Sequence, residues 1–209
     1  MGIIVQKFGG TSVADTDKIK NVASAVIREK KNGNDVIVVV SAMGHTTDYL
    51  VKMARDITSC PNSREMDMLL ATGEQVSIAL LTMAIQAQGY AAVSMNAMQV
   101  GIITECVHSK ARIVDIKTNK LKEHLDKGEI IVVAGFQGVT PDGEITTLGR
   151  GGSDTSAVAI AGAMNADRCD IYTDVEGVYT TDPRIVPCAT KLKEISYEEM
   201  LELAHVGAN

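Results

Sequence analysis

Apolar and polar segments alternate along the chain in a way that predicts strands followed by helices. Runs rich in aliphatic residues predict strands at residues 3–5, 36–40, 91–93, 100–103, 130–134 and 169–173. Apolar positions at helical spacing predict helices around residues 19–31, 48–53, 64–70, 76–87, 121–125, 154–164 and 197–204, with residues 71–74 as a break between two of them. Residues 135–147 are predicted to form a hairpin that turns at Pro141-Asp142-Gly143. The fully apolar strands indicate a mostly parallel sheet covered by helices, which is the α/β class.

Composition and charge argue against some classes of binding partner. The 209 residues carry a net charge of −6 and no basic run, which argues against nucleic acid as a partner. We find no stretch that stays apolar over the ~20 residues needed to cross a bilayer. We also find no leader sequence, and we therefore expect a cytoplasmic protein without a membrane partner.

The four cysteines match no zinc-binding spacing. They are Cys60, Cys106, Cys169 and Cys188. In a cytoplasmic protein we expect reduced thiols that are buried or half-buried. No residue is predicted to be a metal ligand.

A glycine turn follows the first predicted strand. Lys7 precedes the adjacent Gly9 and Gly10, and Thr11 and Ser12 add hydroxyl groups. A strand, a glycine turn and a helix together direct backbone N–H groups toward an anion, although many such turns serve only to reverse the chain. The next helix is predicted to begin with Asp15 as its N-cap.

A second glycine-rich helix entry lies at residues 150–154. Ser153 is predicted to be its N-cap, and Arg150 adds a positive charge that favours an anion. Asp154 contradicts a simple anion site. Its carboxylate can orient Lys7, organise metal-bound water, or only complement the helix dipole.

Thr47 and Glu74 are further candidates, both predicted to lie in breaks beside helices. A free amino acid needs an arginine for its α-carboxylate and a carboxylate for its ammonium, and Arg150 and Glu74 can supply that pair. The four histidines have no evident partners, so we expect surface or loop roles for them and no general base. They are His45, His108, His124 and His205.

Five motifs in order along the whole chain resemble the catalytic domains of aspartokinases, within the amino-acid kinase family. They are residues 7–12, residues 41–48, Thr72-Gly73-Glu74, residues 148–154 and residues 172–184. The resemblance implies a three-layer α/β/α sandwich whose half at roughly 1–135 binds the amino acid and whose half at roughly 136–209 binds ATP. It also implies phosphorylation of L-aspartate by ATP and Mg²⁺ to 4-phospho-L-aspartate, the first step toward lysine, threonine and methionine.

The resemblance also implies roles for individual residues. Lys7 would stabilise the transferring phosphoryl group, and Asp154 would organise that lysine. The residues expected to hold aspartate are Ser41, Thr47, Glu74, Arg150 and Ser153. The residues expected to line the nucleotide are Lys7, Gly9, Gly10, Thr173, Asp174, Tyr179 and Arg184.

Two departures from the family pattern qualify these expectations. Aspartokinases continue into paired regulatory (ACT-type) domains, which are absent here, so feedback inhibition is not expected and a homodimer is in doubt. Asn209 stands where some relatives have a nucleotide-contacting lysine, and Glu176 stands where aspartate is common.

Two alternatives remain open. One is a related kinase acting on acetylglutamate, glutamate or a nucleoside monophosphate; Glu74 argues against an acetylated amine or a phosphate as its partner. The other is a catalytically incomplete nucleotide-binding fragment. A dinucleotide-binding module does not fit, because the glycine pattern after the first strand is wrong.

Overall fold

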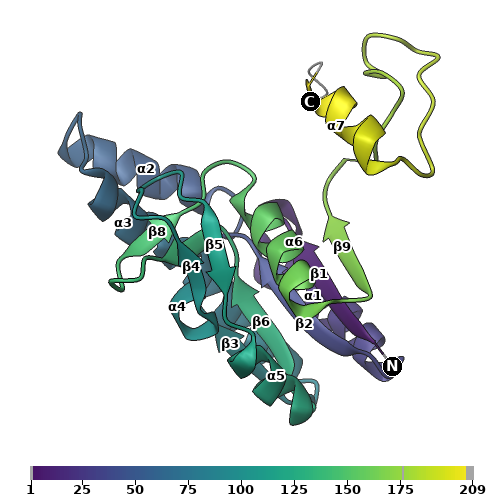
Figure 1. Cartoon of the computed structure of the whole chain (residues 1–209), viewed down its shortest axis with the longest axis horizontal. Helices are drawn as coiled ribbons and strands as arrows, with labels where there is room; N and C mark the ends of the chain where they lie inside the picture. Colours follow the sequence, from purple (N-terminus) through teal and green to yellow (C-terminus); the bar gives the residue numbers. More distant parts are fainter. Residues whose placement is uncertain (1, 176, 206–209) are drawn as a thin grey trace. The chain divides into compact units, whose positions relative to one another are not determined.

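The computed structural model describes residues 2–175 and 177–205. These residues form two compact units, which divide between Thr173 and Asp174 (Figure 1). The predicted departures at Glu176 and Asn209 lie outside the described residues.

Five parallel strands form the central sheet of the first unit. In sheet order they are β3 (Ala92–Met95), β6 (Ile130–Ala134), β2 (Asp35–Val40), β1 (Ile3–Phe8) and β9 (Arg168–Tyr172). Phe8 is in register with Val40 on one side and with Tyr172 on the other. The turns that follow β1, β2 and β9 therefore start at the same edge of the sheet, which is where ligands bind in such folds.

Helices cover both faces of this sheet. The helices α1 (Thr16–Lys31) and α3 (Ser63–Gln86) pack on one face, where Val36, Val38 and Val40 are buried. On the other face α4 (Ala97–Val100), α5 (Asn119–Asp126) and α6 (Gly152–Met164) pack over Ile37 and Val39. Because both faces are buried, the strands read as continuous apolar runs. The predicted α/β/α sandwich with a mostly parallel sheet is confirmed.

A second, smaller sheet lies beside α4. Its strands are β5 (Ile113–Ile116), β4 (Ile102–Thr104), β7 (Gln137–Val139) and β8 (Ile145–Thr147). The pair β7–β8 confirms the predicted hairpin. The strand predicted at 100–103 is shifted, because Asn96 forms a capping box with Gln99 and starts the short helix α4. We did not predict β5, because Asp115 interrupts its short run of apolar residues.

The helix α3 corrects a second expectation. It runs without a break through Ala71, Thr72, Gly73 and Glu74, where we predicted an interruption. Gly73 is present there for packing, since a Cβ atom on it would lie 2.9 Å from the Cβ of Ala42. The close approach of helix and turn requires glycine even though glycine weakens a helix.

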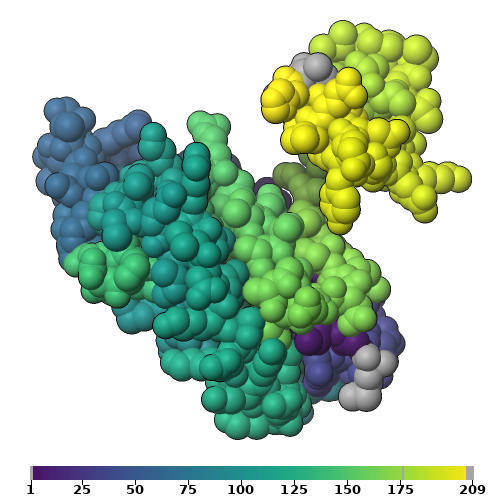
Figure 2. All heavy atoms as spheres, in the orientation of Figure 1, coloured from purple at the N-terminus to yellow at the C-terminus, as the bar shows by residue number. Residues whose placement is uncertain are grey.

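The uninterrupted α3 is, by length and composition, apolar enough to cross a membrane, contrary to our expectation for the chain. We missed this because a break at residues 71–74 would have left two short helices. The same description fits a core helix, and α3 buries Ile78, Leu81 and Ile85 against the sheet. In Figure 2 the ends of α2 (Thr46–Ile57) and α3, in blue, project from the first unit.

Replacing Gly73 with alanine should destabilise the protein by about 1–3 kcal/mol, because the added methyl group has no room beside Ala42. Gly162, in α6, is the matched control: nothing lies within 4 Å of its Cβ position, so Gly162→Ala should stabilise by up to about 1 kcal/mol. Urea unfolding of the two variants measures both effects. Equal stability of Gly73→Ala and the wild type would contradict the packing described here.

The second unit contains a bridge between Tyr179 and Lys191 and the helix α7 (Tyr197–His205), which was predicted.

All four cysteines are free thiols, as expected. Our expectation of their burial is wrong for three of them, because only Cys169 is half-buried and the other three are exposed.

Candidate functional site

Three segments of backbone converge at Ala42, directly after β2. A Cβ atom on Gly10 would lie 2.8 Å from the carbonyl oxygen of Ala42, and the Gly44 N–H donates to the Gly10 oxygen at 3.0 Å. From the third segment, α3, the Glu74 carboxylate accepts a hydrogen bond from the Ala42 N–H at 3.1 Å. The glycine turn after β1, the turn after β2 and the middle of α3 are thereby held together. The turn after β1 continues as a 3₁₀ helix (Gly10–Val13), and the predicted N-cap Asp15 of α1 is confirmed.

Glu74 is the most unusual group in this region. Glu74 is 2% exposed, and its Oε2 is buried without a hydrogen-bond partner among residues 2–175 and 177–205. Burial raises the pKa of the Glu74 carboxyl from 4.5 to about 7, because it penalises the charged form. An unsatisfied buried carboxylate oxygen costs free energy unless a ligand supplies a donor, and an ammonium group would do so.

Lys7 lies at the end of β1, 8% exposed, with its ammonium directed at the second glycine-rich segment. Its Nζ is 2.7 Å from Oδ1 of Asp154, and a Cβ atom on Gly9 would lie 3.5 Å from the same nitrogen. The structure thus brings Lys7 and Gly9 together with Asp154, which lies 147 positions after Lys7 in the sequence. Asp154 also occupies the first turn of α6, so its role as a dipole partner is compatible with its role as the partner of Lys7.

The N-terminus of α6 differs from our expectation. The N-cap is Gly151, at φ 71°, and Ser153 is buried inside the first turn. A Cβ atom on Gly135 would lie 2.8 Å from that of Ser153, so the serine packs against the end of β6. Its hydroxyl group is therefore placed toward the sheet edge and not at the helix cap.

The remaining predicted aspartate-binding residues are Ser41, Thr47 and Arg150. Ser41 follows β2 and is half-buried, and Thr47 is half-buried in the first turn of α2. Arg150 is exposed and forms no ion pair with any other residue among 2–175 and 177–205. Its guanidinium group is available to a carboxylate ligand.

The predicted nucleotide residues are divided between the two units. Thr173 closes the first unit, while Asp174, Tyr179 and Arg184 belong to the second. In the second unit Arg184 holds Asp182 through Nη2–Oδ2 at 2.7 Å and Nε–Oδ1 at 3.0 Å, which lowers the pKa of that carboxyl. Their shared role at a nucleotide stays a prediction.

One buried carboxylate, Asp67, was missed in the sequence. Asp67 is fully buried in α3 and pairs with His108, at 2.8 Å, and with other groups on β8 and the β4–β5 loop. His45 and His124 also have carboxylate partners, Asp48 and Glu129, so our expectation of unpartnered histidines is wrong for three of the four. No spacing rule relates Asp67 to residue 108, since their contact is tertiary.

Among the described residues no cluster of three or more His, Cys, Asp or Glu side chains is placed to hold a metal ion. Mg²⁺ bound with a nucleotide takes most of its oxygens from phosphates and water and needs only one or two carboxylates. Asp154, half-exposed beside Lys7 and Gly9, fits that requirement. The glycine turn at Gly9 and the Lys7 cation, 3.5 Å from the Cβ position of Gly9, also fit a phosphate group.

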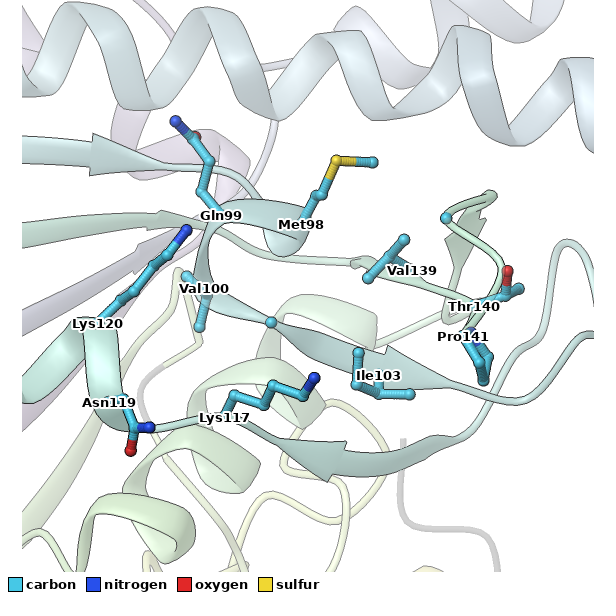
Figure 3. A pocket seen from close by; sticks show the side chains of 12 residues that line it. Met98, Gln99, Val100, Ile103, Lys117, Asn119, Lys120, Val139, Thr140 and Pro141 are labelled. Carbon is cyan, nitrogen blue, oxygen red and sulfur yellow. The ribbon is translucent and has the colours of Figure 1, made fainter.

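A separate cavity of about 410 Å³ lies between α4, β4, the start of α5 and the β7–β8 hairpin (Figure 3). Its apolar wall includes Val100, Ile103 and Val139, and its polar rim carries Lys117 and Lys120. None of the predicted site residues lines it.

The sequence model of the amino acid kinase family matches residues 2–209. This chain belongs to the amino acid kinase family. It is 64% identical to the aspartokinase of Geobacillus stearothermophilus over 208 residues, which cover all of this chain and 51% of that protein. The chain thus spans about half the length of the curated relatives it matches.

Solved structures agree with this family membership. The aspartate kinase from Synechocystis superposes with a TM-score of 0.84 at 54% identity, covering 98% of this chain and 34% of that one. E. coli aspartokinase III, in complex with aspartate and ADP, gives 0.85 at 29% identity, covering 97% of this chain and 56% of that one. The predicted resemblance to aspartokinases is confirmed.

Proposed function

We propose that this chain catalyses transfer of the γ-phosphoryl group of ATP to the side-chain carboxylate of L-aspartate, giving 4-phospho-L-aspartate. The observation that carries the proposal is the buried Oε2 of Glu74, which has no hydrogen-bond partner in the described part of the chain. The identity with proteins named aspartokinase supports it, as does the complex of E. coli aspartokinase III with aspartate and ADP.

Glu74 selects for a free amine on the acceptor. A cationic α-ammonium would donate a charge-assisted hydrogen bond to Oε2 and keep the carboxylate ionised despite its burial. An acetylated amine or a phosphate offers no such charge. Arg150, which forms no ion pair with another described residue, would bind the α-carboxylate in bidentate fashion.

The acceptor needs no general base, because a side-chain carboxyl with a pKa near ~4 is already ionised at neutral pH. The difficulty is the attack of one anion on another. Lys7 would neutralise charge on the transferring phosphoryl group, and Asp154 would hold the Lys7 ammonium in place. Mg²⁺ bound with ATP would supply further neutralisation, with Asp154 as the carboxylate nearest to it.

The other roles remain proposals of the same kind. Ser41, Thr47 and Ser153 would complete the aspartate site, and Gly9 and Gly10 would line the phosphates. Thr173, Asp174, Tyr179 and Arg184 would line the nucleotide. Residues 1–135 would then form the amino-acid half and residues 136–209 the ATP half of a cytoplasmic enzyme, either monomeric or a homodimer.

Analogues of aspartate that lack the cationic amine test this assignment. Succinate and N-acetyl-L-aspartate both retain the acceptor carboxylate, but neither can pair with Glu74. We expect kcat/KM with either compound to fall at least ~100-fold below that with L-aspartate, since the buried carboxylate is left unpaired. Steady-state ADP release measures all three. Equal use of L-aspartate and succinate would contradict the role of Glu74.

A further inference from the structure

A buried carboxylate outside the proposed substrate site joins three elements of the first unit. Asp67, in α3, is 0% exposed. It accepts hydrogen bonds from the Thr147 hydroxyl at 2.6 Å and from the Ser109 N–H at 3.0 and 3.1 Å, and His108 Nδ1 lies 2.8 Å from it. Thr147 ends β8, and His108 and Ser109 belong to the β4–β5 loop. We call these four residues the Asp67 cluster.

The Asp67 cluster is connected by backbone to the loop that presents Arg150. The Thr147 oxygen accepts from the Ala111 N–H at 2.9 Å, which ties the end of β8 to the β4–β5 loop a second time. Two residues later, Gly149 packs on that loop, since a Cβ atom on it would lie 3.5 Å from the Ser109 oxygen. The Gly149 oxygen in turn accepts from the Gly152 N–H at 3.1 Å, at the start of α6.

Arg150 itself gives this loop no anchor. It is exposed, and it forms no ion pair with another residue in the described part of the chain. A guanidinium that must meet a carboxylate in bidentate geometry needs a fixed backbone, because small displacements of a binding group cost large factors in rate. A fully satisfied buried polar network supplies such rigidity.

We propose that the Asp67 cluster is a positioning device for residues 148–152, which sets Arg150 for the α-carboxylate of the acceptor. Asp67 and Thr147 are positioning residues, because they act through the loop and do not touch substrate. The identity of the substrate in this inference rests on the proposed function. The rigidity of the loop rests only on the hydrogen bonds described above.

Two substitutions at Thr147 form a matched pair. Thr147→Val keeps the shape of the side chain and removes the hydroxyl donor to Asp67, whereas Thr147→Ser keeps the donor. We expect Thr147→Val to raise the KM for aspartate by about 10- to 100-fold while the KM for ATP changes less than about twofold. Thr147→Ser should restore most of the affinity for aspartate. A purely structural role would lower stability without separating the two KM values.

Hydrogen exchange measured by mass spectrometry gives a readout that is independent of activity. In Thr147→Val, peptides covering residues 148–152 should exchange at least ~10-fold faster than in the wild type, and peptides covering β1 and β2 should be unchanged. Should Thr147→Val fail to fold, His108→Ala removes a partner that is 24% exposed and should give the same pattern at smaller amplitude.

Unchanged exchange at residues 148–152 would overturn the inference, and so would faster exchange with an unchanged KM for aspartate. Wild-type protein that does not phosphorylate aspartate would overturn the proposed function instead. In that case the exchange comparison still decides whether the Asp67 cluster holds the loop, so the two failures are distinguishable.

Discussion

Lys7→Ala should lower the turnover of aspartate phosphorylation about 1,000-fold, and the protein should still fold. The Nζ of Lys7 lies over Gly9, 2.7 Å from Asp154, where it would meet the charge that develops on the transferring phosphoryl group. Losing one such preorganised contact typically costs 10²–10³ in rate. ADP release under saturating substrates measures the loss, and circular dichroism during thermal unfolding establishes that the fold is intact.

Lys20→Ala provides the matched control for that experiment. Lys20 also pairs with an aspartate, Asp17, at 3.0 Å, but on the exposed surface of α1. Its removal should change turnover less than about twofold, because exposed ion pairs contribute little. Near-normal activity in a correctly folded Lys7→Ala protein would contradict the catalytic role assigned to Lys7.

Glu74→Gln should weaken aspartate binding and at the same time change the pH dependence of stability. In the wild type, Glu74 must be ionised to attract the ammonium group. The KM for aspartate should therefore rise about tenfold for each pH unit below about 7. In Glu74→Gln the KM should be high and nearly independent of pH from 6 to 8. Initial rates across that range measure both, and a KM in the wild type that does not depend on pH would contradict the role of Glu74.

The stability effect has the opposite sign to that of a paired carboxylate. The folded state keeps a proton on Glu74 up to a pKa of about 7, whereas the unfolded chain releases it near 4.5. The free energy of unfolding therefore falls as the pH rises from 4.5 to 7, by about 3 kcal/mol at 1.36 kcal/mol per unit. Relative to the wild type, Glu74→Gln should gain that amount between pH 4.5 and pH 8. Urea unfolding curves of the two proteins that run parallel over this range would refute the raised pKa.

Local patterns were sufficient to predict the layered fold. The runs at residues 36–40 and 130–134 are buried on both faces, and no other common architecture accommodates them so well. The interruption predicted in α3 failed for a tertiary reason. Gly73 reads as a helix breaker in one dimension, yet it is required by the approach of Ala42, which lies 31 positions earlier.

The site was predictable as a set of residues but not as a geometry. Both glycine turns follow from local residues, whereas the pairing of Lys7 with Asp154 was one of three possible roles for Asp154 and was assigned through the resemblance to aspartokinases. The burial of Glu74 and its orphaned Oε2 depend on the turn after β2, which no local pattern encodes. Asp67 was missed for the same reason, because all of its partners lie at least 41 positions away.

Direct detection of the product tests the central proposal most simply. The 209-residue chain would be incubated with Mg-ATP and, separately, L-aspartate, L-glutamate, N-acetyl-L-glutamate or UMP, with hydroxylamine to trap any acyl phosphate. The proposal predicts aspartyl hydroxamate with L-aspartate and no product with the other three acceptors. Folded protein that phosphorylates a different acceptor, or none of them, would contradict the assignment of aspartate kinase activity to this chain.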